Sequence, residues 1–149
     1  MAIKTLKSPK VGQELRDRFQ AEARRLAKLN HPNVVRIYDV GKVGGQPYFV
    51  MEYLEGITLS RRLRRSSVSM DTAIAILRRL LNGLNAVHSL GMVHRDIKPG
   101  NVILGLDGKS CHLLDFGLTA EYDPTAGLQS TVGGTQGYVA PERFSRIAR

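Results

Sequence analysis

A long amphipathic helix predicted over residues 69–90 constrains the fold of this chain most strongly. Its apolar side chains recur at three- and four-residue spacing: Ile74, Leu77, Leu81, Leu84 and Val87. That spacing places them on one face of a helix. Gly91 follows at the position where helices commonly end in a left-handed glycine. The apolar face needs cover, so we expect other elements to pack against it.

The N-terminal third of the chain alternates extended and helical patterns. Residues 1–7 predict a short strand, and residues 14–29 repeat apolar side chains with helical spacing. The segment Asn30-His31-Pro32-Asn33 ends that helix, because proline disfavours helix at the residue before it. Residues 34–40 and 47–54 flank a glycine-rich turn. These two segments predict a β-hairpin.

The rest of the chain predicts shorter elements. Gly56 and the polar residues after it predict a hinge that leads into the long helix. Beyond that helix, residues 102–104 and 112–114 predict two short strands around a turn at Gly108. Residues 119–137 are rich in glycine, serine and threonine and predict a long loop.

Composition limits the partners of the chain. Among its 149 residues, 22 Lys and Arg face 13 Asp and Glu, so the formal net charge is +9. This excess predicts affinity for polyanions such as nucleotides and nucleic acids. Cys111 is the single cysteine, which excludes an internal disulfide and a cysteine-based zinc cluster. No apolar run approaches the roughly 18 residues that a membrane span needs, so we expect a soluble chain.

The segment His94-Arg95-Asp96-Ile97-Lys98-Pro99-Gly100-Asn101 carries groups that phosphoryl transfer requires. Transfer of a γ-phosphoryl group needs a carboxylate for the proton of the attacking hydroxyl, an oxygen ligand for magnesium and a nearby cation. Asp96, Asn101 and Lys98 supply these three groups in one short loop. A lone His-Arg-Asp triplet occurs by chance, but the complete eight-residue pattern makes chance remote.

A second motif, Asp115-Phe116-Gly117, follows Asn101 by 14 residues at the end of an apolar strand. Magnesium prefers carboxylate, carbonyl and phosphate oxygens, so Asp115 is a candidate metal ligand beside Asn101. Alone, this tripeptide would be interpreted as an ordinary turn. Its position shortly after the first motif favours the metal-binding interpretation.

With both motifs, the chain resembles the protein kinase superfamily, in particular bacterial-type serine/threonine kinases. The resemblance implies an α+β, kinase-like two-lobed fold that is truncated at both ends. Residues 1–54 would form part of the N-lobe and residues 55–149 part of the C-lobe. It also implies ATP and Mg²⁺ as cofactors and a protein substrate with Ser or Thr hydroxyls. We expect a cytoplasmic location, with membrane anchoring of the parent protein through segments outside the kinase domain as the alternative.

The resemblance assigns the N-terminal strand to the ATP phosphates. Met1-Ala2-Ile3-Lys4 is similar to the end of the family's Val-Ala-Ile-Lys strand, which implies that Lys4 binds the α- and β-phosphates. Its expected partner is a helix glutamate. Glu22 fits best because it lies nine residues before His31-Pro32-Asn33, and Glu14 is the rival candidate. Taken alone, Lys4 and Glu22 would be interpreted as solvated surface charges.

The adenine pocket is also placed by resemblance. Met51-Glu52-Tyr53-Leu54 resembles the hinge between the two kinase lobes. This implies that Met51 borders the pocket and that the backbones of Glu52 and Leu54 hydrogen-bond the base. Ala2 and Ile103 would sandwich the adenine ring. Plain core positions are the alternative interpretation for Ala2 and Ile103.

The activation segment would run from Asp115 to Glu142 and end in Ala140-Pro141-Glu142. The resemblance makes Thr131 the first candidate for regulatory phosphorylation and Ser130 the second. Arg95 would pair with the phosphate through charge-assisted hydrogen bonds. A hydroxyl-rich loop without a regulatory role is the alternative.

Thr135 is expected to contact Asp96 and Lys98 and to help admit a Ser or Thr hydroxyl. Lys98, two residues after the aspartate, favours Ser and Thr over Tyr substrates by family pattern.

Three function classes remain open on the sequence. The first is an ATP- and Mg²⁺-dependent Ser/Thr kinase. The second is an inactive kinase remnant or nucleotide-binding interaction module, because neither a glycine-rich loop nor the C-terminal kinase helices are present in the chain as given. On that ground we expect little activity from the isolated chain. The third, nucleic-acid binding, is disfavoured because no aromatic residues are interleaved with the arginine clusters at 61–65 and 78–79.

Overall fold

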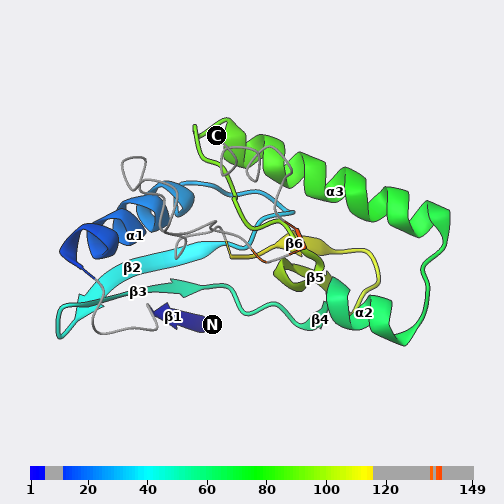
Figure 1. The fold of residues 1–149 in the computed structure, drawn as a ribbon, viewed down its shortest axis with the longest axis horizontal. Helices are drawn as coiled ribbons and strands as arrows, with labels where there is room; N and C mark the ends of the chain where they lie inside the picture. Colours follow the sequence, from blue (N-terminus) through cyan, green and yellow to red (C-terminus); the bar gives the residue numbers. More distant parts are fainter. Residues whose placement is uncertain (6–11, 116–134, 136, 139–149) are drawn as a thin grey trace, which may run out of the picture.

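The structure, a computed structural model, describes residues 1–5, 12–115, 135, 137 and 138. Its first part is a three-stranded antiparallel sheet in the order β1-β3-β2. The elements of this part are β1 (Ala2–Thr5), α1 (Gln13–Leu26), β2 (Ile37–Val43) and β3 (Gln46–Met51). Helix α1 packs along β2 and β3 (Figure 1).

The second part contains another three-stranded antiparallel sheet, in the order β4-β5-β6. Its elements are β4 (Gly56–Thr58), α2 (Leu59–Arg65), α3 (Met70–His88), the 3₁₀ turn η1 (Pro99–Asn101), β5 (Val102–Gly105) and β6 (Cys111–Leu113). The long helix α3 packs against β6, and the short helix α2 lies beside η1 (Figure 1).

The predicted hairpin is confirmed, but its first strand begins later than expected. The turn lies at Gly44 and Gly45, whose φ angles of 56° and 76° favour glycine. Strand β2 starts at Ile37 rather than residue 34 because the preceding residues pair elsewhere. The N–H of Val35 donates to the carbonyl of Leu113 (3.0 Å), and the N–H of Leu113 donates to the carbonyl of Asn33 (2.9 Å). These bonds join the two sheets.

Helix α3 confirms the main prediction from the sequence. Ser69 caps it by accepting a hydrogen bond from the N–H of Thr72 (3.3 Å), and Gly91 follows its end with φ 67°. Strand β4 and helix α2 were not predicted, because the polar sequence after Gly56 reads as a hinge. Thr58 starts α2 by accepting from the N–H of Arg61 (3.2 Å).

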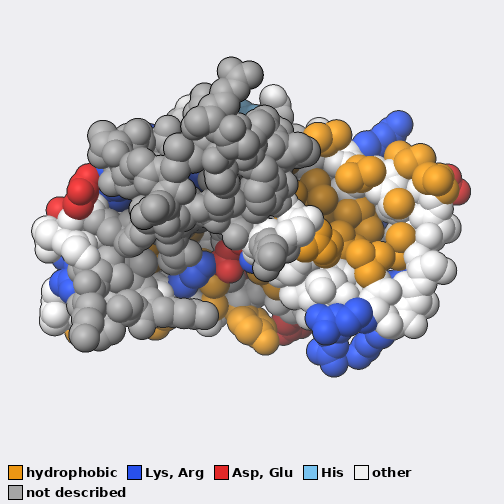
Figure 2. Space-filling model, in the orientation of Figure 1, with side chains coloured by type: hydrophobic (Ala, Val, Ile, Leu, Met, Phe, Trp, Pro, Cys, Tyr) orange, Lys and Arg blue, Asp and Glu red, His pale blue; other side chains and the backbone are white. Residues whose placement is uncertain are grey.

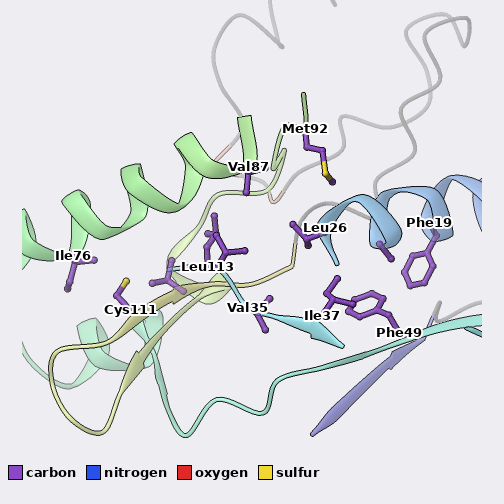
Figure 3. Packing of buried hydrophobic residues seen from close by; sticks show 13 residues of the cluster. Phe19, Leu26, Val35, Ile37, Phe49, Ile76, Val87, Met92, Cys111 and Leu113 are labelled. Carbon is purple, nitrogen blue, oxygen red and sulfur yellow. The ribbon is translucent and has the colours of Figure 1, made fainter. Parts of the chain in front are cut away.

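One continuous hydrophobic core connects both sheets (Figure 3). Phe19, Ala23 and Leu26 supply the contribution of α1, and the Phe19 and Phe49 rings lie 5.4 Å apart. Leu113 of β6 is fully buried, as is Val87 of α3. The core therefore extends from the first helix to the last described strand.

The predicted apolar face of α3 is buried only in part. Val87 is fully buried, whereas Ile74 is 43%, Leu77 57% and Leu81 63% exposed. Hydrophobic side chains gather over the first half of this helix in the space-filling view (Figure 2). In the described part of the chain, no helix combines the length and hydrophobicity that a membrane crossing requires.

Gly83 sets how closely α3 approaches the connection between the sheets. A Cβ atom at this position would lie 2.9 Å from the Asn33 carbonyl oxygen and 3.3 Å from Val34 Cγ2. The first distance is too short for a carbon and a backbone oxygen, so the helix or the connection would have to move.

We predict that Gly83→Ala lowers the free energy of unfolding by about 1 kcal/mol. At an open helical position, replacing Gly by Ala would stabilise the protein by about 1 kcal/mol. The sign of the change in the free energy of unfolding therefore tests the close approach. Urea unfolding followed by circular dichroism measures it, with Asn82→Ala on the exposed side as the control. A stabilised Gly83→Ala protein would contradict the close approach.

Candidate functional site

Asp96 lies at the centre of a dense hydrogen-bond cluster. Its Oδ2 atom lies 2.7 Å from Lys98 Nζ and accepts from Asn101 Nδ2 (2.8 Å). Its Oδ1 atom accepts from the N–H (3.1 Å) and the hydroxyl (2.9 Å) of Thr135. Lys98 Nζ also donates to the Thr135 hydroxyl. The structure thus brings together Asp96, Lys98, Asn101 and Thr135, as the sequence predicted.

These contacts control the charge of Asp96. Burial acts to raise the pKa of Asp96, but the hydrogen bonds from Lys98, Thr135 and Asn101 and the charge of Lys98 outweigh it. The pKa of the carboxyl group is therefore held below its usual value. The result is a carboxylate that stays ionised and is fixed in orientation.

His94 holds the start of the same loop. It is 1% exposed, and its Nδ1 atom accepts from the N–H of Asp96 (3.3 Å). Because Nδ1 accepts, Nε2 carries the proton and donates it to the carbonyl of Leu114 (2.7 Å). Burial lowers the pKa of His94, although the Leu114 carbonyl and the charges of Asp96 and Asp115 oppose this effect. His94 is therefore a neutral connector between the loop and the strand that leads to Asp115.

Two non-glycine residues of the site have left-handed backbones. The φ angle is 67° at Arg95 and 49° at Asp115. Such conformations are uncommon for side chains with a Cβ atom and persist where surrounding bonds enforce them. Here the N–H of Leu114 donates to the carbonyl of Asn101 (2.8 Å), which fixes the residue before Asp115 against the end of the loop.

Lys4 is paired with Asp115. Lys4 and Ala2 point to the same face of β1, because side chains alternate along a strand and Ile3 is on the outer face. Lys4 Nζ lies 2.5 Å from Asp115 Oδ1. The structure therefore brings the residue predicted for the phosphates to the residue predicted for the metal.

The expected pairing of Lys4 with Glu22 is not made in the described part of the chain. Glu22 Oε1 instead lies 3.7 Å from Arg95 Nη1, so Arg95 joins α1 to the loop that carries Asp96. Burial raises the pKa of Glu22, and the charges of Arg95, Arg25 and Arg18 offset this effect only in part. The rival candidate, Glu14, is exposed and pairs with Arg18 one turn along α1.

Of the residues predicted for the hinge, Met51 is the last residue of β3, and Glu52 and Leu54 follow it. Ala2 of β1 pairs with Met51 of β3. Two residues predicted for the adenine pocket are therefore neighbours in the sheet. The N–H of Glu52 donates to the carbonyl of Arg36 (2.9 Å), which leaves its carbonyl for a ligand. Among the described residues, the backbone of Leu54 has no hydrogen-bond partner.

Ile103 belongs to the other sheet, where it is opposite Thr58 on β4 and His112 on β6. Its predicted role as the second side of an adenine sandwich stays a prediction. Ser130 and Thr131, the predicted phosphorylation sites, lie outside the described residues.

Two oxygen atoms of the site suit a hard cation. The Asn101 amide nitrogen is used on Asp96, and the Asp115 Oδ1 atom is used on Lys4. The remaining oxygens, Asn101 Oδ1 and Asp115 Oδ2, accept no hydrogen bond from the described residues. The same part of the chain contains no cluster of three or more His, Cys, Asp or Glu side chains. Two protein oxygens fit Mg²⁺, which takes its other ligands from phosphate and water.

Sequence reasoning gave no role to His94 or Asn33. His94 was part of the motif, and only the structure shows that it joins Asp96 to Leu114. Asn33 was interpreted as part of a turn. Its Nδ2 atom donates to the carbonyl of Cys111 (3.0 Å) and supports the junction of the sheets. The sequence signal that could have indicated this role is the position of a polar side chain directly after Pro32.

Comparison with known proteins gives one consistent family. The family model described as the protein kinase domain matches residues 1–148. Serine/threonine-protein kinase PknL of Mycobacterium tuberculosis is 41% identical over 147 residues, covering 96% of this chain and 36% of PknL. A probable serine/threonine-protein kinase PknB of Lactococcus lactis is 37% identical, covering 96% of this chain and 23% of that protein. The chain thus spans about a third or less of these relatives.

Solved structures agree with the sequence matches. The PknI kinase domain of Mycobacterium tuberculosis superposes with a TM-score of 0.71 at 31% identity, covering 79% of this chain and 49% of that one. Rad53 in complex with AMP-PNP gives a TM-score of 0.77 at 30% identity, covering 98% of this chain and 35% of that one. The described fold is that of part of a kinase domain.

We predict that His94 makes the protein less stable in mild acid. The ordinary pKa of histidine is 6.5 and that of His94 is lowered, so the unfolded chain binds the proton first as pH falls. The contribution of neutral His94 to the free energy of unfolding is complete above about pH 6.5. It is lost as the pH falls toward the lower pKa that His94 has in the folded protein. Urea unfolding from about pH 8 to about pH 5.5 measures it.

His94→Asn serves as the comparison for this prediction. The variant is expected to be less stable at every pH but to have a flatter dependence of stability on pH. Equal slopes for the two proteins would contradict the role of His94.

Proposed function

The chain belongs to the protein kinase family, and we propose that it transfers the γ-phosphoryl group of ATP to Ser or Thr hydroxyls of proteins. One observation supports this best. The hydroxyl of Thr135 donates to Asp96 Oδ1 and accepts from Lys98 Nζ. A small aliphatic hydroxyl therefore fits between the proposed base and the proposed cation. The hydroxyl of a substrate Ser or Thr has the same chemistry as this internal one.

In the proposed reaction, Asp96 accepts the proton of the substrate hydroxyl as its oxygen attacks the γ-phosphorus. The new O–P bond forms while the bond from that phosphorus to the β,γ-bridging oxygen breaks, and ADP leaves. Lys98 donates to the transferred group and stabilises its developing charge. The lowered pKa of Asp96 keeps the carboxylate ionised until the proton arrives.

The residues proposed for Mg²⁺ are Asn101 and Asp115, through the two oxygens that accept no hydrogen bond from the described chain. When bound, the ion would neutralise phosphate charge and orient the γ-phosphoryl group. The ion pair of Lys4 with Asp115 keeps both groups beside each other before nucleotide binds. Lys4 would then contact the phosphates, and the backbone of Leu54 and the carbonyl of Glu52 would contact the base.

Regulation through Arg95 is the second part of the proposal. The guanidinium group of Arg95 lies 3.7 Å from Glu22, with its side chain about one third exposed. A phosphate on Thr131 or Ser130 would compete with Glu22 for this guanidinium through stronger charge-assisted bonds. Release of Glu22 would then allow it to approach Lys4.

We predict that Asp96→Asn lowers phosphoryl transfer by at least about 100-fold, because a neutral amide cannot accept the proton. Transfer of radiolabelled phosphate to a generic Ser/Thr substrate measures it. Asp71→Asn, an exposed aspartate in the first turn of α3, is the matched control and should retain activity. Equal activity of wild type and Asp96→Asn would overturn the proposed base. Nucleotide binding without any transfer would instead favour a nucleotide-binding module.

We predict that Asp115→Asn removes the Mg²⁺ dependence of ATP binding, because an amide oxygen is a weaker ligand than a carboxylate. Thermal unfolding with ATP, with and without Mg²⁺, measures it on the chain itself and needs no catalysis. Asp71→Asn should keep the additional Mg²⁺-dependent stabilisation. The same Mg²⁺ effect in Asp115→Asn would exclude Asp115 as the ligand.

A further inference from the structure

Helix α2 carries a concentrated basic surface that the proposed chemistry does not use. Its four arginines, Arg61, Arg62, Arg64 and Arg65, are named here the α2 arginine face. At about 100° per residue, they fall within roughly 160° of the helix circumference. Lys and Arg side chains gather in the space-filling view where Figure 1 draws α2 (Figure 2). The face is one surface rather than four scattered charges.

The charges of this face are not neutralised by described residues. None of the four arginines forms an ion pair within residues 1–5 and 12–115. Arg62 donates to the carbonyl of Ser66 (3.0 Å), and Arg64 lies 3.4 Å from Ser60 Oγ. Within the described residues, the guanidinium groups of Arg62 and Arg64 therefore have only neutral partners.

Helix stability does not account for the whole face. Basic residues in the last turn suit the helix dipole, and Arg62, Arg64 and Arg65 are there. Arg61 is in the first turn, where a cation is unfavourable, and no acidic residue accompanies it. Arg61 and Arg65 are also four residues apart, a spacing at which like charges repel. An anionic ligand would remove this repulsion.

The position of α2 indicates what kind of ligand would be useful. The helix packs against η1, the turn that contains Asn101, and against β4 and β5. The helix therefore lies next to the turn that ends the loop carrying Asp96. Its arginine face is on the side opposite Leu59, which packs on the core, so a substrate segment bound there would extend past the helix to reach the proposed phosphoryl-transfer site.

We propose that the α2 arginine face docks an acidic segment of the protein substrate and so favours substrates rich in Asp and Glu near the phosphorylated hydroxyl. This inference rests on the proposed function and names its substrate class. Guanidinium groups suit carboxylates because their planar N–H donors match two carboxylate oxygens. Helix α2 has no aromatic side chain, so it lacks the stacking surface that single-stranded nucleic acids use.

Direct binding tests this proposal without requiring catalysis. The probes are two fluorescent peptides with the same Thr-containing sequence, one with a run of Glu and one with Gln at those positions. Anisotropy is measured with the chain in the absence of ATP. We expect the Glu peptide to bind more tightly, with an affinity that falls between about 50 mM and about 300 mM salt as the charges are screened.

Arg61→Gln/Arg65→Gln is the diagnostic variant, since the side chains of both arginines make no hydrogen bond to described residues. Exposed ion pairs are individually weak, so we expect about a fivefold loss of affinity for the Glu peptide. Arg24→Gln/Lys28→Gln removes the same charge from exposed positions at the end of α1 and beyond. This control should change the affinity less than about twofold.

Several outcomes would overturn the docking proposal. Equal binding of the Glu and Gln peptides would exclude selection of acidic substrates. Equal losses of affinity for the Glu peptide in the two double variants would show that binding depends on net charge and not on the α2 arginine face. Anionic vesicles or a single-stranded oligonucleotide that bind through Arg61 and Arg65, when the Glu peptide does not, would assign the face to another partner. Peptide binding with no phosphoryl transfer would support docking while contradicting the proposed function, so the two can be separated.

Discussion

The candidate site depends on how both ends of the loop from His94 to Asn101 hold Leu114. His94, at the start of the loop, donates to the carbonyl of Leu114 (2.7 Å), and the N–H of Leu114 donates to the carbonyl of Asn101 (2.8 Å), at its end. These two bonds fix Leu114, the residue before Asp115. They thereby support the left-handed backbone of Asp115. His94 and Asn101 are buried, so leaving these bonds unmade would be costly. The loop and the strand end that carries Asp115 are thus one structural unit.

Charge pairing extends this unit across the chain. Lys4 of β1 meets Asp115, and Arg95 of the loop meets Glu22 of α1, so each half of the molecule supplies one cation and one anion. Both pairs are partly exposed, so their attraction contributes little stability and their partners can be exchanged at small cost. We therefore interpret them as adjustable contacts between the two parts of the molecule, which share one hydrophobic core.

Sequence reasoning succeeded where chemistry and short spacing coincide. Asp96, Lys98 and Asn101 lie within six residues, so few backbone paths separate them, and the structure joins all three. It failed where distance in space depends on backbone details. The Lys4–Asp115 pair joins residues 111 positions apart, and the late start of β2 follows from the pairing of Asn33 and Val35 with Leu113. The hydrophobic pattern does not distinguish a strand that starts at residue 34 from one that starts at Ile37, because Val34 and Val35 are buried in either case.

The hydrogen-bond capacity of Asp96 links nucleotide binding to the proposed chemistry. A carboxylate offers about four lone-pair sites. Asp96 fills them with the N–H and hydroxyl of Thr135, the amide of Asn101 and the ammonium of Lys98. An incoming substrate hydroxyl must therefore displace one donor. Lys98 is the donor that a bound γ-phosphate would attract away, because phosphate oxygens compete strongly for an ammonium group. On the proposed function, ATP binding would then free Oδ2 of Asp96 for the substrate, and the base becomes available only when the phosphoryl donor is present.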